Sequence, residues 1–194
     1  MLPEVWGPPH WDFFHTFSEN IHESAYPQVG PILFVFIVRI CRNLPCPECS
    51  SHASRFLAKI NIRSLKTKSD LKNLMYIFHN FVNKRKNKLM FPQTELENKY
   101  KRKNIVDVFK RFLRVFNTRG NMNLLSESFQ RDFVIRDLKS WFKSSAHHFV
   151  PLVNPSKNLI QPTSISKEET THEEKTTHEG QDEKETTKDE ETML

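Results

Sequence analysis

Two closely spaced cysteines are the side chains of this chain best suited to chemistry. Cys46 and Cys49 enclose a proline and a glutamate in the order Cys-Pro-Glu-Cys. Thiols three residues apart can close a disulfide, and the positive end of a helix dipole favours a thiolate when such a pair lies at a helix start. The pair therefore predicts either a redox centre or part of a metal site.

A structural zinc site is the alternative interpretation of the same cysteines. Cys46, Cys49 and His52 would supply three ligands and His15 or His79 the fourth, which is the ligand number typical of structural zinc. No second Cys-x-x-C motif follows in the sequence, which disfavours zinc. Covalent haem attachment needs a histidine directly after the second cysteine, and a serine occupies that position.

Two further clusters place aromatic, imidazole and amide groups at helical spacing. Amide and imidazole groups on an apolar helix face are unfavourable unless they are hydrogen-bonded. A large planar ligand with polar edges would satisfy them, and the basic turn at 84–88 suits a pyrophosphate. The residues concerned are Trp11 and His15, one helical turn apart, and His79, Asn80 and Asn83, on one face of another expected helix.

The hydrophobic pattern of residues 8–101 predicts that helices position these groups. Apolar residues at three- and four-residue spacing predict four helices, at about 8–24, 32–43, 45–57 and 69–89. Pro27 and Pro31 are expected to end the first helix, and Ser69-Asp70 to cap the fourth. Four helices with short connections form a bundle, and Leu96 and Tyr100 suit a short fifth helix.

Beyond residue 101 the expected organisation changes. Amphipathic stripes at 105–116 and 124–148 predict an added helical hairpin in a basic extension, residues 102–154. The tail, residues 155–194, has five Lys and eleven Asp or Glu, net −6, which leaves 24 basic and 12 acidic residues, net +12, before it. The tail has too few large apolar residues to form a core and is predicted to be disordered. The chain is therefore expected to be all-α, with its first domain at 1–101.

The composition argues against several classes of protein. Only four glycines occur, and neither a Rossmann fingerprint nor a P-loop motif is present. The longest apolar run, 32–38, is far shorter than the roughly 20 residues that span a bilayer, so no transmembrane helix is expected. The first four residues carry no positive charge before an apolar stretch, so no secretory signal is expected. These features predict a cytoplasmic location.

The basic stretches leave a binding function open as a second class. Lysines and arginines gather at 84–88 and 99–103 and recur through 110–119. They could form a surface for nucleic acid or another scaffold. No RNA- or DNA-binding fold is apparent, however, and the aromatic residues of this region fall on the stripes expected to be buried.

Three motifs in chain order resemble the FAD-linked sulfhydryl oxidases of the Erv/ALR family. They are Gly-Pro-x-x-Trp-x-x-x-His at 7–15, Cys-x-x-Cys-x-x-His at 46–52 and His-Asn-x-Val-Asn at 79–83, with Lys88 nine residues after His79. The resemblance covers roughly residues 6–101. It implies a four-helix bundle with a short fifth helix that holds FAD, and an enzyme that oxidises client dithiols and passes electrons to dioxygen, giving hydrogen peroxide. The composition further suggests the versions encoded by large DNA viruses.

The resemblance also implies a role for each matched residue. Cys46 would exchange with substrate, and Cys49 would lie nearest the isoalloxazine ring. Lys88 would approach the phosphates, and His79 would pack against the adenine side. The full set of implied FAD-binding residues is Gly7, Trp11, His15, His52, His79, Asn80, Val82, Asn83, Lys88, Lys99 and Tyr100.

The chain departs from the family mainly in its cysteines. Cellular members have a second disulfide that clamps the fourth helix to the segment after it, and the matching positions here are Tyr76 and Gln93. Many members also have a shuttle pair of cysteines, whereas only Cys41, expected to be structural, remains here. Substrates are therefore expected to reach Cys46 directly or through a relay protein with its own Cys-x-x-C.

The resemblance has two further implications, for assembly and location. The family forms homodimers through its first two helices, and the apolar stretch 32–38 could serve such a contact. The expected locations are the host cytoplasm or virus factory and the virion.

Overall fold

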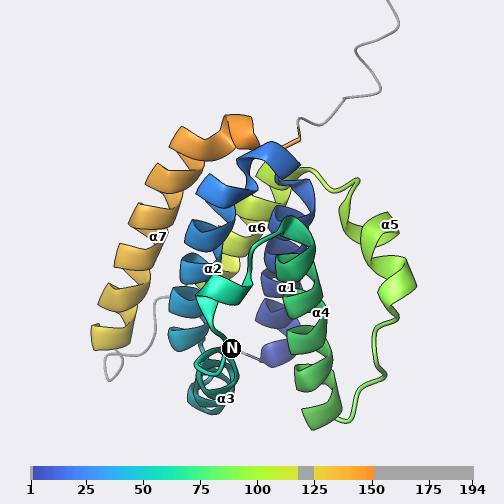
Figure 1. The fold of residues 1–194 in the computed structure, drawn as a ribbon. Coiled ribbons are helices and arrows are strands. Elements are labelled where there is room, and N and C mark those ends of the chain that lie inside the picture. Colours follow the sequence, from blue (N-terminus) through green and yellow to red (C-terminus); the bar gives the residue numbers. More distant parts are fainter. Residues whose placement is uncertain (1, 118–124, 151–194) are drawn as a thin grey trace, which may run out of the picture. The chain divides into compact units, whose positions relative to one another are not determined.

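Seven α-helices make up the computed structural model, which describes residues 2–117 and 125–150, without the side chains of 125–128. The described part contains no strand, only an isolated antiparallel bridge between Ile21 and Phe149. This confirms the predicted all-α class. The helices are α1 (Pro3–Asn20), α2 (Tyr26–Arg42), α3 (Pro47–Leu57), α4 (Lys68–Arg85), α5 (Leu96–Tyr100), α6 (Ile105–Phe116) and α7 (Leu125–Ser145), and single 3-10 turns lie at Glu23–Ala25, Ile62–Ser64, Gln93–Glu95 and Ala146–His148 (Figure 1).

The first helix begins earlier than predicted, and the two prolines expected in its first turn lie inside it. We expected Pro8 and Pro9 to form the first turn, but α1 starts at Pro3 and continues through both. Neither proline has the N–H that would bond a carbonyl one turn earlier, so two helical hydrogen bonds are missing there. The side chain of Trp6 is 6% exposed, and its burial favours continuing the helix before the prolines.

The second helix also contains a proline that was expected to break it. Pro27 lies in the first turn of α2, where its missing N–H costs nothing, and Pro31 lies further along the same helix. The expectation that Pro31 precedes the helix is therefore wrong. Burial outweighs the single lost hydrogen bond, because Leu33, Ile37 and Ile40 are fully buried in the core.

The N-cap residue of the fourth helix is Thr67 rather than Ser69, and Asp70 takes part in the cap as expected. The hydroxyl oxygen of Thr67 accepts from the backbone N–H of Asp70 at 3.1 Å, and the Asp70 carboxylate accepts from the N–H of Thr67 at 2.8 Å. This reciprocal pair is a capping box. The helix ends at Arg85, so Leu89, which was expected to belong to it, lies in the following segment and is 93% exposed.

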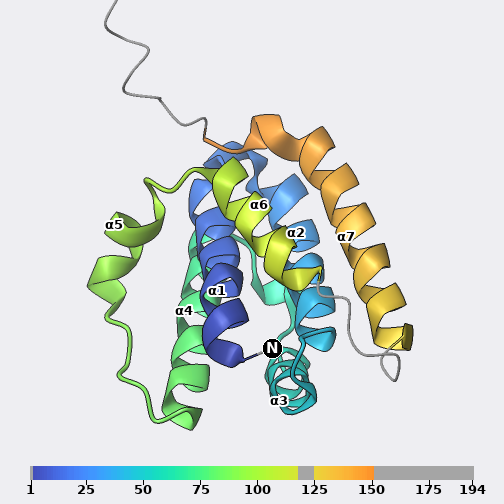
Figure 2. The same ribbon diagram turned by 180° about the vertical axis from the view of Figure 1, so that it is seen from behind.

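Helices α6 and α7 pack on the first two helices within one compact unit, residues 1–154. Phe112 of α6 stacks on Phe13 of α1, with 4.4 Å between ring centroids. Figure 2 shows α6 lying along α1, and α7 lying on the outer side of α2 in both views. A salt bridge of 2.7 Å between Arg39 and Asp137 joins α2 to α7. The predicted disorder of residues 155–194 concerns a segment outside the described residues.

One stretch of the described chain is long and apolar enough to cross a membrane, although none was expected. It runs over Glu23–Arg42, and 56% of the tested window is buried inside the bundle. A buried core helix has the same composition, so this finding is weak evidence for a membrane span.

Candidate active site

A disulfide lies at the N-terminal end of α3. Cys46 is the residue that caps α3, and it is bonded to Cys49 in the first turn, with 5.2 Å between the two Cα atoms. The backbone N–H of Cys49 donates to the sulfur of Cys46 at 3.2 Å. Pro47 is the first residue of the helix, which fixes the turn that brings the cysteines together.

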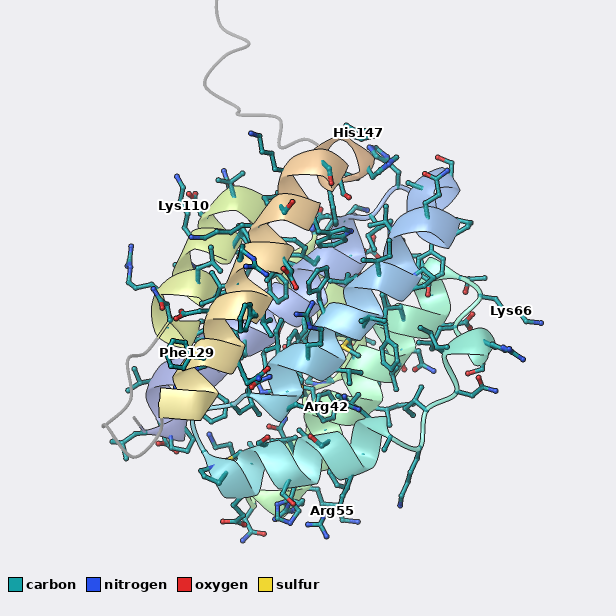
Figure 3. The ribbon with its side chains drawn as sticks, turned by 90° about the vertical axis from the view of Figure 1, so that its left-hand side faces the viewer. Arg42, Arg55, Lys66, Lys110, Phe129 and His147 are labelled. Carbon is teal, nitrogen blue, oxygen red and sulfur yellow. A yellow bond between two sulfur atoms is a disulfide. The ribbon has the colours of Figure 1, made fainter. Side chains whose placement is uncertain are left out.

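Helix α3 closes the end of the bundle formed by the other helices. Figure 3 shows α3 crossing below the end of α2, which is marked by Arg42. The hydroxyl of Ser50 donates to the backbone carbonyl of Arg42 at 2.8 Å, and Arg85 at the end of α4 lies 3.4 Å from Glu48. These contacts hold the start of α3 against the ends of α2 and α4.

A cavity of about 490 Å³ lies beside this disulfide. Its walls come from α1, α2, α3, α4 and α5 and from the segment after α4. Cys49 lines the cavity, whereas Cys46 does not. The two sulfurs therefore face different surroundings, and only Cys49 borders the space in which a ligand could lie.

Ten of the thirteen residues predicted for the site line this cavity. Three do not: Cys46, His15 and Asn80, of which His15 and Asn80 are buried behind the wall. The ten residues that line the cavity are Gly7, Trp11, Cys49, His52, His79, Val82, Asn83, Lys88, Lys99 and Tyr100.

Stacked rings form one wall of the cavity. The indole of Trp11 and the imidazole of His79 are nearly parallel, with 4.1 Å between centroids. Phe91 continues the stack on His79 at 6.0 Å. Tyr100 stacks on His15 at 4.5 Å, so His15 supports the wall from behind. Such flat apolar surfaces suit the planar rings of a ligand.

The two histidines of this wall are held neutral. Burial, together with a smaller effect of the nearby positive charge of Lys99, lowers the pKa of His15 to about 3 and that of His79 to about 4. Their rings share a hydrogen bond of 3.0 Å between Nε2 of His15 and Nδ1 of His79. One ring must donate and the other accept, so the bond couples the two tautomers.

Basic side chains also line the cavity. Arg85, Lys86, Lys88 and Lys99 all line it, and the only acidic side chains among the lining residues are Glu4, Asp12 and Glu48. Clustered lysine and arginine side chains bind phosphate groups through charge-assisted hydrogen bonds. The cavity therefore brings together stacked rings, lysine and arginine side chains and one sulfur of a disulfide.

Several cavity residues were not predicted. Trp6 and His10, one turn apart, line the cavity from a different face of α1 than Trp11, so extending the face of Trp11 and His15 by one turn leads to Gly7 and does not find them. Cys41 also lines the cavity, and the expectation of burial agrees with its exposed fraction of 1%. The other unpredicted lining residues include Phe14, Leu44, Ala53, Phe78 and Phe81.

A zinc site finds no support among the described residues. No group of three or more His, Cys, Asp or Glu side chains within residues 2–117 and 125–150 is placed to hold a metal ion. Cys46 and Cys49 are bonded to each other, and a zinc ligand must be a free thiolate. The ring nitrogen Nδ1 of His52 lies 2.7 Å from the carbonyl of Glu48, to which it donates.

The sequence of this chain is similar to a known protein family and to several viral proteins. The sequence model of the Erv1/Alr family matches residues 8–102. A protein of African swine fever virus (isolate Pig/Kenya/KEN-50/1950) is 30% identical over 95 residues, which cover 49% of this chain and 79% of the relative. Protein 347L of Invertebrate iridescent virus 6 is 26% identical over 105 residues, 51% of this chain and 95% of the relative.

A third viral protein, 096R of Invertebrate iridescent virus 3, is 29% identical over 87 residues, which cover 44% of this chain and 59% of the relative. The names of all three relatives contain the words FAD-linked sulfhydryl oxidase. No solved structure matches the chain significantly.

Proposed function

The chain belongs to the Erv1/Alr family, and from this membership we propose that it is an FAD-linked thiol oxidase that forms disulfides in client proteins. One observation carries the proposal. Cys49, one half of the disulfide, lines the same cavity as the stacked rings and the four cations. The sulfur of Cys49 therefore belongs both to the disulfide and to the wall of the cavity in which a cofactor would bind.

The cavity has the size of an ordinary ligand pocket, and its lining suits the chemistry of FAD. Ligand pockets commonly measure about 300–1,000 Å³, and this one measures about 490 Å³. Trp11, His79 and Tyr100 offer faces for the planar rings, while Lys88 and Lys99 supply charge for the diphosphate. When bound, FAD supplies the acceptor for two electrons and passes them to dioxygen, which is reduced to hydrogen peroxide.

The chain's own cysteines perform the thiol chemistry. A client thiolate attacks the sulfur of Cys46, so a bond between client and Cys46 forms while the Cys46–Cys49 bond breaks and Cys49 leaves as a thiolate. The second client thiolate then attacks the client sulfur of this mixed disulfide. That step closes the client disulfide and releases Cys46 as a thiolate, so the client has lost two electrons and the enzyme pair has gained them.

The positions of the two sulfurs favour this assignment of roles. Cys46 does not line the cavity, which leaves it as the sulfur for clients, and Cys49 borders the cofactor space. The N–H of Cys49, 3.2 Å from the sulfur of Cys46, is placed to stabilise the thiolate that Cys46 becomes. Clients are dithiol proteins or a relay protein with its own Cys-x-x-C.

A cofactor titration combined with one variant tests the proposal. The purified chain should bind FAD, absorb at about 450 nm and consume oxygen with dithiothreitol. Cys49→Ser should keep FAD but lose this turnover, because the remaining sulfur does not border the cofactor. A colourless protein that does not respond to added FAD, or a Cys49→Ser protein that still consumes oxygen, would contradict the proposal.

We propose further that the enzyme is viral and acts in the host cytoplasm, in virus factories or in virions, since the relatives described above come from viruses. The homodimer that the family resemblance implies also stays a proposal. Ile32 and Val35 are exposed on α2 and could contribute to such a contact.

Mass spectrometry of client peptides trapped on Cys46 in a Cys49→Ala variant would identify the substrates.

A further inference from the structure

The side chain of Asn80 is almost fully occupied by bonds to the protein. Its Oδ1 accepts from the backbone N–H of Phe91 at 2.8 Å and from Nδ2 of Asn83 at 3.3 Å. Its Nδ2 donates to the backbone carbonyl of Phe91 at 3.0 Å. The residue is 3% exposed and does not line the cavity. An asparagine amide can make four hydrogen bonds, so only one N–H is left for any ligand.

The segment after α4, residues 86–92, is held in place by hydrogen bonds of this kind. Asn87 adopts a left-handed conformation with φ of 51°, and the N–H groups of Lys86 and Lys88 both bond the carbonyl of Asn83. Leu89 and Met90, which follow, are 93% and 58% exposed. A segment that buries so little apolar surface is held mainly by its hydrogen bonds. The two hydrogen bonds between the side chain of Asn80 and the backbone of Phe91 therefore hold the C-terminal end of this segment in place.

Phe91 connects this segment to the cavity wall. Its ring lies parallel to that of His79, and the ammonium of Lys99 lies 4.4 Å from its centroid. His79 and Lys99 both line the cavity, as does Lys88 earlier in the segment. Fixing the backbone of Phe91 thus fixes a ring that lies against two lining residues.

We propose that Asn80 is a positioning residue that acts through Phe91. Its amide clamps the segment 86–92 onto α4 and thereby holds the wall against which FAD binds, without contacting FAD itself. The inference rests on the proposed function for the identity of the ligand. The clamp itself rests only on the bonds between Asn80 and the backbone of Phe91. It assigns Asn80 a role different from the direct FAD contact that the family resemblance implies.

Two measurements on Asn80→Ala test the clamp. Hydrogen exchange of the backbone amides in 88–92, measured without FAD, should become at least about tenfold faster, because two hydrogen bonds are lost. The FAD dissociation constant should rise about tenfold for the same reason. The rate at which dithiothreitol reduces the Cys46–Cys49 disulfide in FAD-free protein should not change. Asn73→Ala, an exposed position two turns earlier in α4, is the matched control and should change nothing.

A cross-link distinguishes positioning from direct contact. Tyr76, one turn before Asn80, and Gln93, two residues after Phe91, are the positions that match the clamping disulfide of cellular family members, so Tyr76→Cys and Gln93→Cys should form a disulfide that joins α4 to the segment after it. Added to Asn80→Ala and verified by mass, it should restore FAD affinity. Affinity that stays weak despite the cross-link, or weakened affinity with unchanged exchange at 88–92, would overturn the proposal. Faster exchange at 88–92 with unchanged FAD affinity would overturn it as well.

The same experiment keeps the two proposals apart. If the unmodified chain binds no FAD, the proposed function fails, while exchange at 88–92 still reports whether Asn80 clamps the segment. If the unmodified chain binds FAD and Asn80→Ala binds it equally well, the proposed function stands and the positioning role of Asn80 fails.

Discussion

Cys41 lines the same cavity as Cys49, yet its surroundings keep its sulfur unreactive. It is buried, and this burial raises the pKa of its thiol well above the ordinary value. A protonated thiol is neither a nucleophile nor a ready partner for disulfide exchange. At the scale of single residues, burial therefore sets Cys41 apart from the bonded pair of Cys46 and Cys49.

We expect Cys41→Ala to retain oxidation of both small dithiols and protein clients. Loss of the packed sulfur should lower the free energy of unfolding by about 1 kcal/mol. Oxygen consumption measures the activity. In the unmodified chain, iodoacetamide should label Cys41 only after the protein unfolds. A variant that oxidises dithiothreitol but not protein clients would show that Cys41 belongs to an electron relay.

The sequence identified most of the site because helical spacing determines which side chains share a face. Trp11 and His79 could be assigned to the site from their motifs, and the structure stacks them. The partner of Asn80 could not be predicted in the same way. Phe91 lies eleven residues away, beyond a turn whose path depends on a single left-handed residue, Asn87. Contacts across such turns leave no periodic signal in the sequence.

At the scale of elements, the spacing of apolar residues predicts the bounds of the helices more accurately than the positions of the prolines do. The stripe of apolar residues at 105–116 predicts α6 to the residue, because one face is apolar and the other carries lysine and arginine. The prolines of α1 and α2 were misleading, since burial of the surrounding side chains outweighs the hydrogen bonds that proline removes. Local propensity therefore failed where tertiary packing was strongest.

The contact between α1 and α6 contains a buried histidine, which makes the stability of this helix pair sensitive to acid. His10 is 2% exposed and lies among aromatic rings, including Phe112 and Phe116 of α6. Burial lowers the pKa of His10 to about 4 from its ordinary value of 6.5. Between these two values the unfolded chain binds a proton that the folded chain does not, so stability falls as the pH falls from 6.5 toward 4.

We expect His10→Phe to reduce this pH dependence by up to one proton, or about 1.4 kcal/mol per pH unit. Urea unfolding at several pH values between 4 and 7 measures the slope. His147→Phe makes the same replacement at an exposed histidine and is the matched control. Equal slopes for His10→Phe and the unmodified chain would mean that the buried ring of His10 is not held neutral.

At the scale of the whole molecule, the part of the chain that matches the family is shorter than the part whose helices pack together. The match ends at residue 102, whereas the described helices that pack together continue to Ser145 of α7. Helix α6 covers the aromatic face of α1, where Phe13 stacks on Phe112. The part of the chain that carries the motifs therefore depends on packing partners that lie outside them.

A fragment of residues 1–102 should consequently fail to fold cooperatively. It lacks the five buried side chains of α6, Ile105, Val108, Phe109, Phe112 and Phe116, and exposes the face of α1 against which α6 packs. At about 1.5–3 kcal/mol for each buried side chain, the loss is roughly 8–15 kcal/mol, which is comparable to the total stability of about 5–15 kcal/mol of a typical domain. Thermal unfolding followed by circular dichroism tests this, with residues 1–154 as the control that should melt cooperatively. A fragment of 1–102 that melts cooperatively and binds FAD would show instead that the first five helices form an independent domain.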